Sequence, residues 1–514
     1  MYVEVPENAP DPNKVSLFRK IIIYAMRLLI TIVSLFICSS SLAQRSNNWA
    51  FGDSVGINFN TVPPTVDTTI IIMSREPAAS ISDLNGNLLF YVGTPSVDIL
   101  PGYMQYVVRN AVDSIMTGVN NFPGHTSITQ GLIIIPNPYD SAKYYIFYLG
   151  GIGILYYSVV DITLNNGLGK VVSANNILYN ATISEKMNAV KAANGKDWWL
   201  IGMEVQNSFT TDYFYKFKID SSGITFKGTQ LIGTPNVPSV GGQMIFSPDG
   251  TKLVYTGGKM ESMIIDFDRC TGTFSNPQLT CPWWQNSCQA NEVKYGASFS
   301  PSSRYAYLSV MDTLWQFDTQ AATIANSKQQ IYIDTVQYFA MGQQMLGPDG
   351  KIYIANAYKY TSPLPYDSMR NGSLSVIESP DSAGSSCNFA PYSFFLNGRK
   401  SLAGLPNMPN YNLGMLEDVN CDSIIGTGIN NSGEDYHFNL YPNPTTDIFN
   451  VEFYGEHFNS LELYSLEGQL LTKTIIQSNT KYLSVDISKY ARGVYLVKLT
   501  DHSNRSFVRK LIHD

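Results

Sequence analysis

The stretch Phe246-Ser-Pro-Asp-Gly-Thr-Lys-Leu-Val-Tyr-Thr-Gly-Gly258 joins a tight turn to a short strand that ends in glycines. Pro, Asp and Gly suit the backbone of such a turn, and the apolar run after it is typical of a strand. Related units recur as Asn85-Gly-Asn-Leu-Leu-Phe-Tyr91, Asn194-Gly-Lys-Asp-Trp-Trp-Leu200, Pro301-Ser-Ser-Arg-Tyr-Ala-Tyr-Leu308 and Gly347-Pro-Asp-Gly-Lys-Ile-Tyr-Ile354. The chain is therefore built from repeats of a turn and a strand.

The repeats have a nearly constant spacing. Equivalent strand positions are separated by 58, 53, 55, 53 and 47 residues, at Leu88, Ile146, Trp199, Val254, Tyr307 and Ile354. A long period with four short strands per unit indicates an all-β chain folded as a β-propeller. The span 44–421 has room for roughly seven blades, and the aromatic segment 47–53 is expected to supply an edge strand that completes the last blade.

The composition fits a secreted all-β protein. Charged residues make up 15% of the chain and aromatic residues 12%, and the net charge is -7. The charge lies in the body, since residues 45–437 carry 30 acidic and 22 basic side chains. An acidic body without a Lys/Arg cluster argues against binding of nucleic acid or an anionic membrane surface, because both need a basic footprint.

Residues 1–43 are predicted to be an N-terminal extension followed by a signal peptide. The true start is expected at Met26, followed by Arg27 and the 11-residue apolar run 28–38, which is too short to span a bilayer. Small residues before position 44 predict cleavage between Ala43 and Gln44. The alternative is a lipoprotein acylated on Cys38, which the bulky residues before that cysteine disfavour.

One segment of the predicted propeller has weak periodicity. Residues 93–130 are longer than a usual loop, and such loops often carry binding residues. We therefore expect a blade insertion there.

Several motifs follow one another in an order that matches a known family. They include Asp83-Leu-Asn-Gly-Asn-Leu-Leu-Phe-Tyr91, Ser127-Ile-Thr-Gln-Gly131, Trp315-Gln-Phe-Asp318 and Gly404-Leu-Pro406. In this order they resemble the propeller region at the front of many secreted Bacteroidota proteins, over roughly residues 45–410. The resemblance implies a surface-exposed propeller and brings no catalytic residues with it.

A second domain, residues 438–514, is predicted after a small-residue linker at 422–437. Five or so short strands in about 75 residues favour a small β-sandwich. The domain resembles the C-terminal (Por) sorting domain of the type IX secretion system, at Pro442, Asn443, Pro444, Gly468, Gly493, Tyr495 and Lys510. The resemblance implies export through the periplasm, contact with the secretion machinery and its sortase, and a body that is attached to the outer surface or released.

Five cysteines follow the predicted signal peptide, in a compartment where disulfides persist. The odd number leaves one cysteine unpaired. We expect local pairing among Cys270, Cys281 and Cys288, and a bridge between Cys387 and Cys421 at the end of the propeller; the connectivity stays open.

No catalytic constellation is visible in the sequence, so we expect no enzyme, no cofactor and no metal. His125 is the one histidine of the body, and it is better explained as a loop or core residue than as a general base. Asp418-Val-Asn420-Cys-Asp422 begins like a calcium loop, but Ser423 replaces the required glycine. Asp249 and Asp349 are turn residues, and two aromatic pairs, Trp283-Trp284 and Tyr103/Tyr106, are candidates for sugar stacking, with core packing as the more common role.

The leading hypothesis is an exported propeller that acts as a binding, adhesion or scaffold module, with a surface glycan or protein as its candidate ligand. The alternative is a hydrolase or lyase acting on extracellular polysaccharide or peptide, with candidate acids at Glu185, Asp212, Glu261 and Glu292. Carboxylates clustered in one polar funnel would favour the enzyme. A funnel plugged by apolar or Asn/Ser side chains would favour binding.

Overall fold

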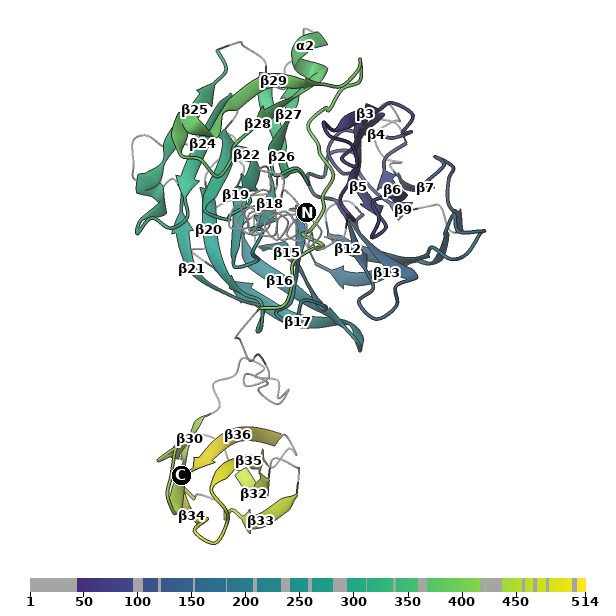
Figure 1. Cartoon of the computed structure of the whole chain (residues 1–514). Helices are drawn as coiled ribbons and strands as arrows, with labels where there is room; N and C mark the ends of the chain where they lie inside the picture. Colours follow the sequence, from purple (N-terminus) through teal and green to yellow (C-terminus); the bar gives the residue numbers. More distant parts are fainter. Residues whose placement is uncertain are drawn as a thin grey trace, which may run out of the picture. The chain divides into compact units, whose positions relative to one another are not determined.

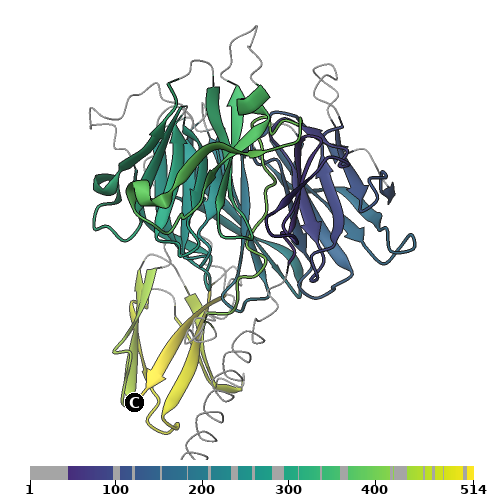
Figure 2. The same ribbon diagram turned by 45° about the horizontal axis from the view of Figure 1, so that its top comes forward.

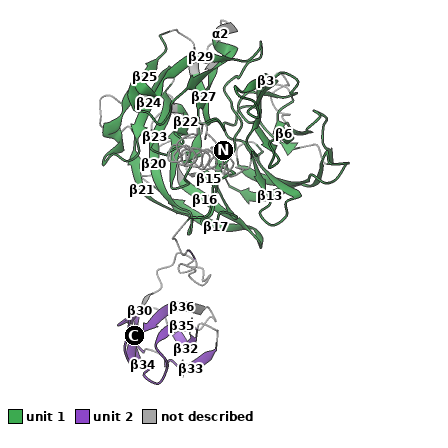
Figure 3. Ribbon diagram, in the orientation of Figure 1, with its two compact units in different colours: residues 1–419 green, residues 420–514 purple. Residues whose placement is uncertain are grey.

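The computed structural model describes residues 44–95, 105–118, 122–150, 153–181, 183–206, 210–232, 241–257, 261–280, 294–310, 312–335, 339–358, 368–416, 421, 437–454, 458–465, 469–477, 480–501 and 506–514. The chain divides into two compact units, residues 1–419 and 420–514 (Figure 3). The predicted signal peptide, including Ala43, lies outside the described residues. Gln44, the first described residue, is exposed.

The described residues of the first unit form seven sheets, and we number them as blades in chain order. Blade 1 has the order β3 (Thr65–Asp67), β2 (Val55–Asn58), β1 (Asn48–Asp53), β4 (Met73–Ser74). Blade 2 has the order β5 (Ala79–Ser82), β6 (Leu88–Gly93), β7 (Gln105–Asn110), β9 (Phe122–Pro123). Blade 3 has the order β10 (Leu132–Pro136), β11 (Lys143–Leu149), β12 (Ile154–Asp161), β13 (Lys170–Asn180), with β8 (Thr117–Gly118) added at its edge.

The other four blades are antiparallel sheets of four consecutive strands. Blade 4 contains β14 (Ile183–Lys191), β15 (Trp198–Gln206), β16 (Thr210–Asp220) and β17 (Gly223–Leu231). Blade 5 contains β18 (Met244–Phe246), β19 (Lys252–Gly257), β20 (Glu261–Asp268) and β21 (Thr273–Leu279). Blade 6 contains β22 (Lys294–Phe299), β23 (Tyr305–Val310), β24 (Thr313–Asp318) and β25 (Gln329–Ile333), and blade 7 contains β26 (Phe339–Leu346), β27 (Ile352–Tyr358), β28 (Ser373–Ile377) and β29 (Phe389–Phe395).

The sheets lie around a common axis, as the colour sequence in Figure 1 and the tilted view in Figure 2 show. Shared apolar clusters join each blade to the next. One such cluster joins the last blade to the first, where the rings of Trp49 and Tyr353 lie 5.5 Å apart. Each sheet buries its apolar faces against its neighbours in the ring. This arrangement confirms the predicted β-propeller of roughly seven blades.

The repeat alignment made from the sequence holds in the structure. All six equivalent positions, from Leu88 in β6 to Ile354 in β27, fall in the second strand of blades 2–7. The seventh such strand is β1, and no turn motif precedes it in the sequence. The prediction that segment 47–53 forms an edge strand of the last blade is wrong, because β1 pairs with both β2 and β4 inside blade 1.

The predicted insertion at residues 93–130 is also wrong in its described part. This segment supplies β7 and β9 of blade 2 and the added edge strand β8 of blade 3. Two of these strands, β8 and β9, are only 2 residues long, which is too short to show a strand periodicity in the sequence.

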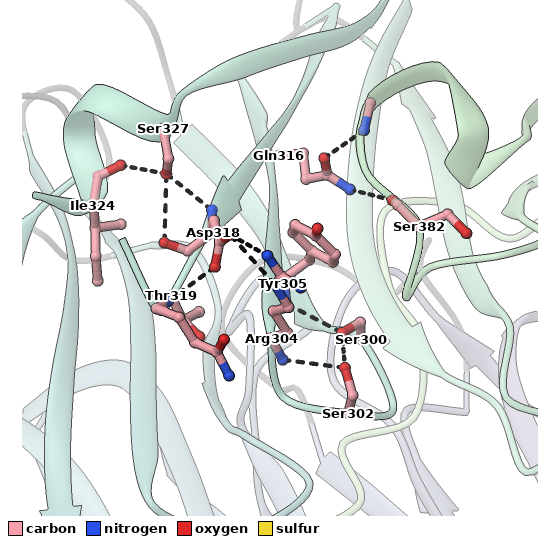
Figure 4. Close-up of polar contacts among 12 residues, drawn as sticks. Ser300, Ser302, Arg304, Tyr305, Gln316, Asp318, Thr319, Ile324, Ser327 and Ser382 are labelled. Carbon is pink, nitrogen blue, oxygen red and sulfur yellow. Dashed lines mark hydrogen bonds and ion pairs between the residues drawn. The ribbon is translucent and has the colours of Figure 1, made fainter. Parts of the chain in front are cut away.

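Blade 6 shows how each repeat fixes its turns. Arg304, after the first turn, pairs with Asp318 at the end of β24 at 3.0 Å, and Asp318 accepts the backbone N–H of Gln320 at 2.9 Å (Figure 4). Blades 5 and 7 repeat the ion pair as Lys252–Asp266 and Lys351–Glu378. The polar pairs therefore hold corresponding turns in three blades.

After β29 the chain returns across the ring, and we call residues 396–416 the return segment. It forms a bridge with blade 1 between Asp53 and Lys400, and another with blade 2 between Ala78 and Pro406. The buried Arg269 of blade 5 then donates to the carbonyl of Gly414 at 2.5 Å. The return segment thus ties blades that are far apart in sequence.

Short helical turns complete the first unit: η1 (Ile324–Ser327), α2 (Ser368–Asn371) and η2 (Gly384–Cys387). No helix in the described ranges has the length and hydropathy that a membrane span requires.

The second unit is the predicted small β-sandwich. One sheet has the order β30 (His437–Tyr441), β31 (Ile448–Tyr454), β34 (Tyr482–Asp486). The other has the order β33 (Leu470–Ile475), β32 (Phe458–Ser465), β35 (Gly493–Asp501), β36 (Ser506–His513). Alternating side chains such as Phe449, Val451, Leu461 and Val497 form the core between them.

Candidate functional site

Side-chain amides fill the axis of the propeller. Gln130, Gln243, Gln343 and Asn407 are all buried, and each one bonds to backbone of another blade or of the return segment. We call these four residues the amide plug. Gln and Asn suit this place because each carries both a donor and an acceptor, which can satisfy the strand ends that converge there.

The bonds of the amide plug cross the ring. Gln243 accepts the backbone N–H groups of Ala297 at 3.0 Å and Gln344 at 2.7 Å. Gln343 donates to the carbonyl of Thr129 and accepts the N–H of Leu405 at 2.8 Å.

Asn407 brings the return segment into the plug. It donates to the carbonyls of Leu132 at 3.0 Å and Met187 at 2.9 Å, and it accepts from Gln130 and Asn188. Within the described residues the middle of the funnel is therefore closed by amides.

Two carboxylates meet at one end of this axis. Glu76 lies just before β5 and is 6% exposed, and Ser127 donates to it at 3.4 Å. Glu185, near the start of β14, accepts the backbone N–H of Thr129 at 3.1 Å and its hydroxyl at 3.0 Å. We call Glu76, Ser127, Thr129, Glu185 and Lys186 the carboxylate mouth.

Burial and repulsion favour the protonated form of Glu76. Burial raises its pKa to about 7, and the negative charge of Glu185 adds to this effect. Arg75 and the hydroxyls of Tyr295 and Ser127 act in the opposite direction. Lys186 is also buried and donates to the carbonyl of Gly241 at 2.7 Å; burial lowers its pKa to about 7, against the attraction of Glu185.

The carboxylate mouth thus brings together an acid with a raised pKa, a second carboxylate that accepts hydrogen bonds, and a buried lysine. Perturbed titrating groups of this kind gather at functional sites. His125 does not take part as a base, since it is exposed and its Nδ1 accepts the backbone N–H of Ser127 at 3.1 Å. The geometry therefore supports hydrogen bonding to a polar ligand and offers no Ser–His pair.

Of the acids named from the sequence, the structure places Glu185 in this site. The side chains of Asp212 and Glu261, and the whole of Glu292, lie outside the described residues. Glu76 was not named from the sequence. Its position could have suggested it, because Glu76 lies shortly before β5, the first strand of blade 2, and Glu185 lies near the start of β14, the first strand of blade 4.

Other sequence candidates have structural roles. Tyr106 is fully buried, as expected for the more common role in core packing, so sugar stacking is excluded for it; Tyr103, Trp283 and Trp284 lie outside the described residues. Asp249 accepts the N–H of Thr251 at 2.9 Å, and Gly250 has a φ of 74°, as the turn requires. Asp418, Asn420 and Asp422 are not described. In the described ranges no three His, Cys, Asp or Glu side chains gather to hold a metal.

The cysteines correct one prediction. Cys387 is a free thiol and is fully buried beside Tyr307, so the expected bridge between Cys387 and Cys421 is wrong. Its burial in the core of blades 6 and 7 leaves no path to a partner. Cys270 and Cys421 are both disulfide-bonded, while Cys281 and Cys288 lie outside the described residues.

The sorting-motif residues lie close to the last strand of the second unit. Asn443 donates to the carbonyl of Lys510 at 2.7 Å and accepts the N–H of Ile512 at 2.8 Å. Tyr495 is buried and donates to the carbonyl of Ala491. Pro442 and Pro444 flank Asn443, Gly493 opens β35, and Gly468 is not described.

Comparison with known proteins identifies this second unit. Residues 439–514 match the family described as secretion system C-terminal sorting domain. The chain is therefore a protein that the type IX secretion system exports to the cell surface or the medium. No curated protein matches the chain.

Solved structures similar to the first unit share little sequence with it. Two are described as candidate 6-phosphogluconolactonases. The one from Bacteroides uniformis is 11% identical, with 64% of this chain and 92% of that chain covered and a TM-score of 0.42. The one from Bacteroides fragilis is 11% identical, with 70% of this chain and 97% of that chain covered and a TM-score of 0.45. A third is the β-propeller domain of Cps50 (Swd1) from Myceliophteria thermophila, which is 11% identical, with 62% of this chain and 95% of that chain covered and a TM-score of 0.38. At this level they carry no argument about activity.

Proposed function

We propose that the protein is an exported binding module that holds a polar extracellular ligand at the carboxylate mouth of its propeller. One observation carries the proposal: Glu76 and Glu185 meet at the end of an axis that amides close. The amide plug closes the axis, and the carboxylate mouth beside it carries several hydrogen-bonding groups. Hydroxyl-rich glycans and peptide amides match these groups, because both donate to carboxylates and accept from a protonated acid.

A second candidate function has its own support. Two neighbouring carboxyl groups, one of which holds its proton more strongly than usual, are the arrangement that glycoside hydrolysis uses for its acid and its nucleophile or base. The same pair could therefore cleave a glycan instead of only holding it.

One experiment separates the two functions. Glycan and peptide arrays are incubated with the secreted protein and with the variants Glu76→Gln and Glu185→Gln, and soluble hits are tested for cleavage. Binding supports the proposal if it is lost in both variants and the ligand is recovered intact. Cleavage that both variants abolish would favour the hydrolase, and hits that bind both variants as well as wild type would exclude the mouth.

Glu378→Gln is a matched control for these variants. It removes one surface carboxylate, the partner of Lys351 in blade 7, and we expect it to bind as wild type does.

A further inference from the structure

A pocket opens among the turns that follow the first strands of blades 2–4. Its volume is about 280 Å³. It is lined by Arg45, Leu84, Pro136, Lys191, Lys196, Trp198 and other residues of these turns. The size suits one small molecule or the end group of a longer one, because ligand pockets begin at about 300 Å³.

Three cations converge on this pocket, and each faces an aromatic ring. The Nζ of Lys191 lies 5.5 Å from the ring centre of Trp198, and the Nζ of Lys196 lies 3.7 Å from that of Tyr139. Arg45 lies over Tyr144 and donates to its hydroxyl at 2.7 Å. An aromatic face attracts a cation without neutralising it, so the positive charge stays available.

The nearby carboxylates already have other partners. Asp197 is 7% exposed, accepts from Asn194 at 2.8 Å and pairs with Lys218 at 3.7 Å. Asp83 accepts the backbone N–H groups of Asn85 and Asn87 in its own turn, and the positive charge of Arg45 acts on it more weakly than these bonds do. Asp140 pairs with Lys143 at 2.6 Å.

Like charges therefore meet at this pocket, where the charge of Arg45 acts against that of Lys191. Among the described residues none of Arg45, Lys191 and Lys196 forms an ion pair. The pKa of Lys191 is lowered first by burial and then by the positive charges of Arg45 and Arg269. Positive groups gathered around a cavity attract an anion into it.

We propose that this pocket binds an oxyanion, either a carboxylate or a sulfate or phosphate group, on a small ligand or chain end. The site is separate from the carboxylate mouth. Glu185 lies near the start of β14 and Lys191 is its last residue, so the two are about 20 Å apart along the strand.

The test is titration calorimetry of the secreted protein at low salt, where charge attraction is least screened. The probes are sodium glucuronate, sodium sulfate and sodium phosphate, with glucose as the neutral control. The variants are Lys191→Gln and Arg45→Gln. Lys170→Gln is the matched control, since it removes an exposed lysine from the outer strand of blade 3.

We expect at least one anion to bind wild type and Lys170→Gln, glucose not to bind, and Lys191→Gln to bind about tenfold more weakly. Glucuronate alone would identify a carboxylate site, and sulfate or phosphate alone a tetrahedral oxyanion site. The proposal is overturned if no anion binds wild type, or if Lys191→Gln and Arg45→Gln, with unchanged melting temperatures, both bind as tightly as wild type.

Discussion

Gln130 and Met244 are joined side chain to backbone across the axis of the ring. The amide of Gln130 donates to the carbonyl of Met244 at 3.0 Å and accepts its N–H at 2.7 Å, although the residues are 114 positions apart. The pair links blade 3 directly to blade 5 and passes over blade 4. Closure of the ring therefore depends on polar bonds along the axis as well as on the apolar clusters between sheets.

Removing this side chain should weaken the whole propeller. Gln130→Ala leaves the N–H and C=O of Met244 without their partner in a buried place, so we expect a loss of about 2–4 kcal/mol in the free energy of unfolding. Denaturant unfolding of the secreted protein measures it. Gln330→Ala, at an exposed position of β25, is the control and should change stability by less than about 0.5 kcal/mol. Equal stability of the two variants would show that the plug is not structural.

Glu76 should make stability fall as pH rises from about 4.5 to about 7. In the folded protein its pKa is about 7 against 4.5 in the unfolded chain, so its contribution is complete below 4.5 and is lost as pH rises through the folded value. A shift of this size corresponds to about 3 kcal/mol. Thermal unfolding across this range measures the slope, and Lys186 adds none below its own pKa of about 7.

Glu76→Gln is expected to lack this slope because glutamine does not titrate. A variant that keeps the full slope would assign the effect to another group and would contradict the protonated state of Glu76.

The sequence predicts the ring well because its signals are local. Turns such as 248–250 and strands such as β19 are encoded by neighbouring residues, and their period together with the length of the span 44–421 indicates roughly seven blades. The site is not predictable in this way. Glu76 and Glu185 come together only when blade 4 closes near blades 1 and 2, and Asn407 reaches the axis through a return segment that carries no periodicity. The error at Asn47–Asp53 has the same origin, since pairing with β4 depends on the ring and not on the strand.

Cys387 should be inert in the folded protein. Its thiol is fully buried, and burial raises its pKa, so little thiolate is available for reaction. We expect iodoacetamide to label it only after denaturation, without a reductant. Peptide mass spectrometry reports the labelling, and fast reaction in the native state or a bridge at this residue would contradict the structure.

Deleting residues 439–514 should stop export without unfolding the propeller. The two units have separate cores, and the sorting family covers only the second. We expect the truncated chain to accumulate in the periplasm with the melting temperature of the secreted body, measured by fractionation and thermal melting. Normal appearance of the truncated chain in the medium would contradict the role of this domain.

The central claim is that ligand binds at the carboxylate mouth, and hydrogen exchange of the secreted protein with its strongest array ligand tests it most directly. The account predicts slower exchange in peptides that cover residues 124–131 and 183–188, where Thr129 and Gln130 bond to Glu185. Protection confined to the opposite turns, at residues 194–197 and 248–250, would contradict it.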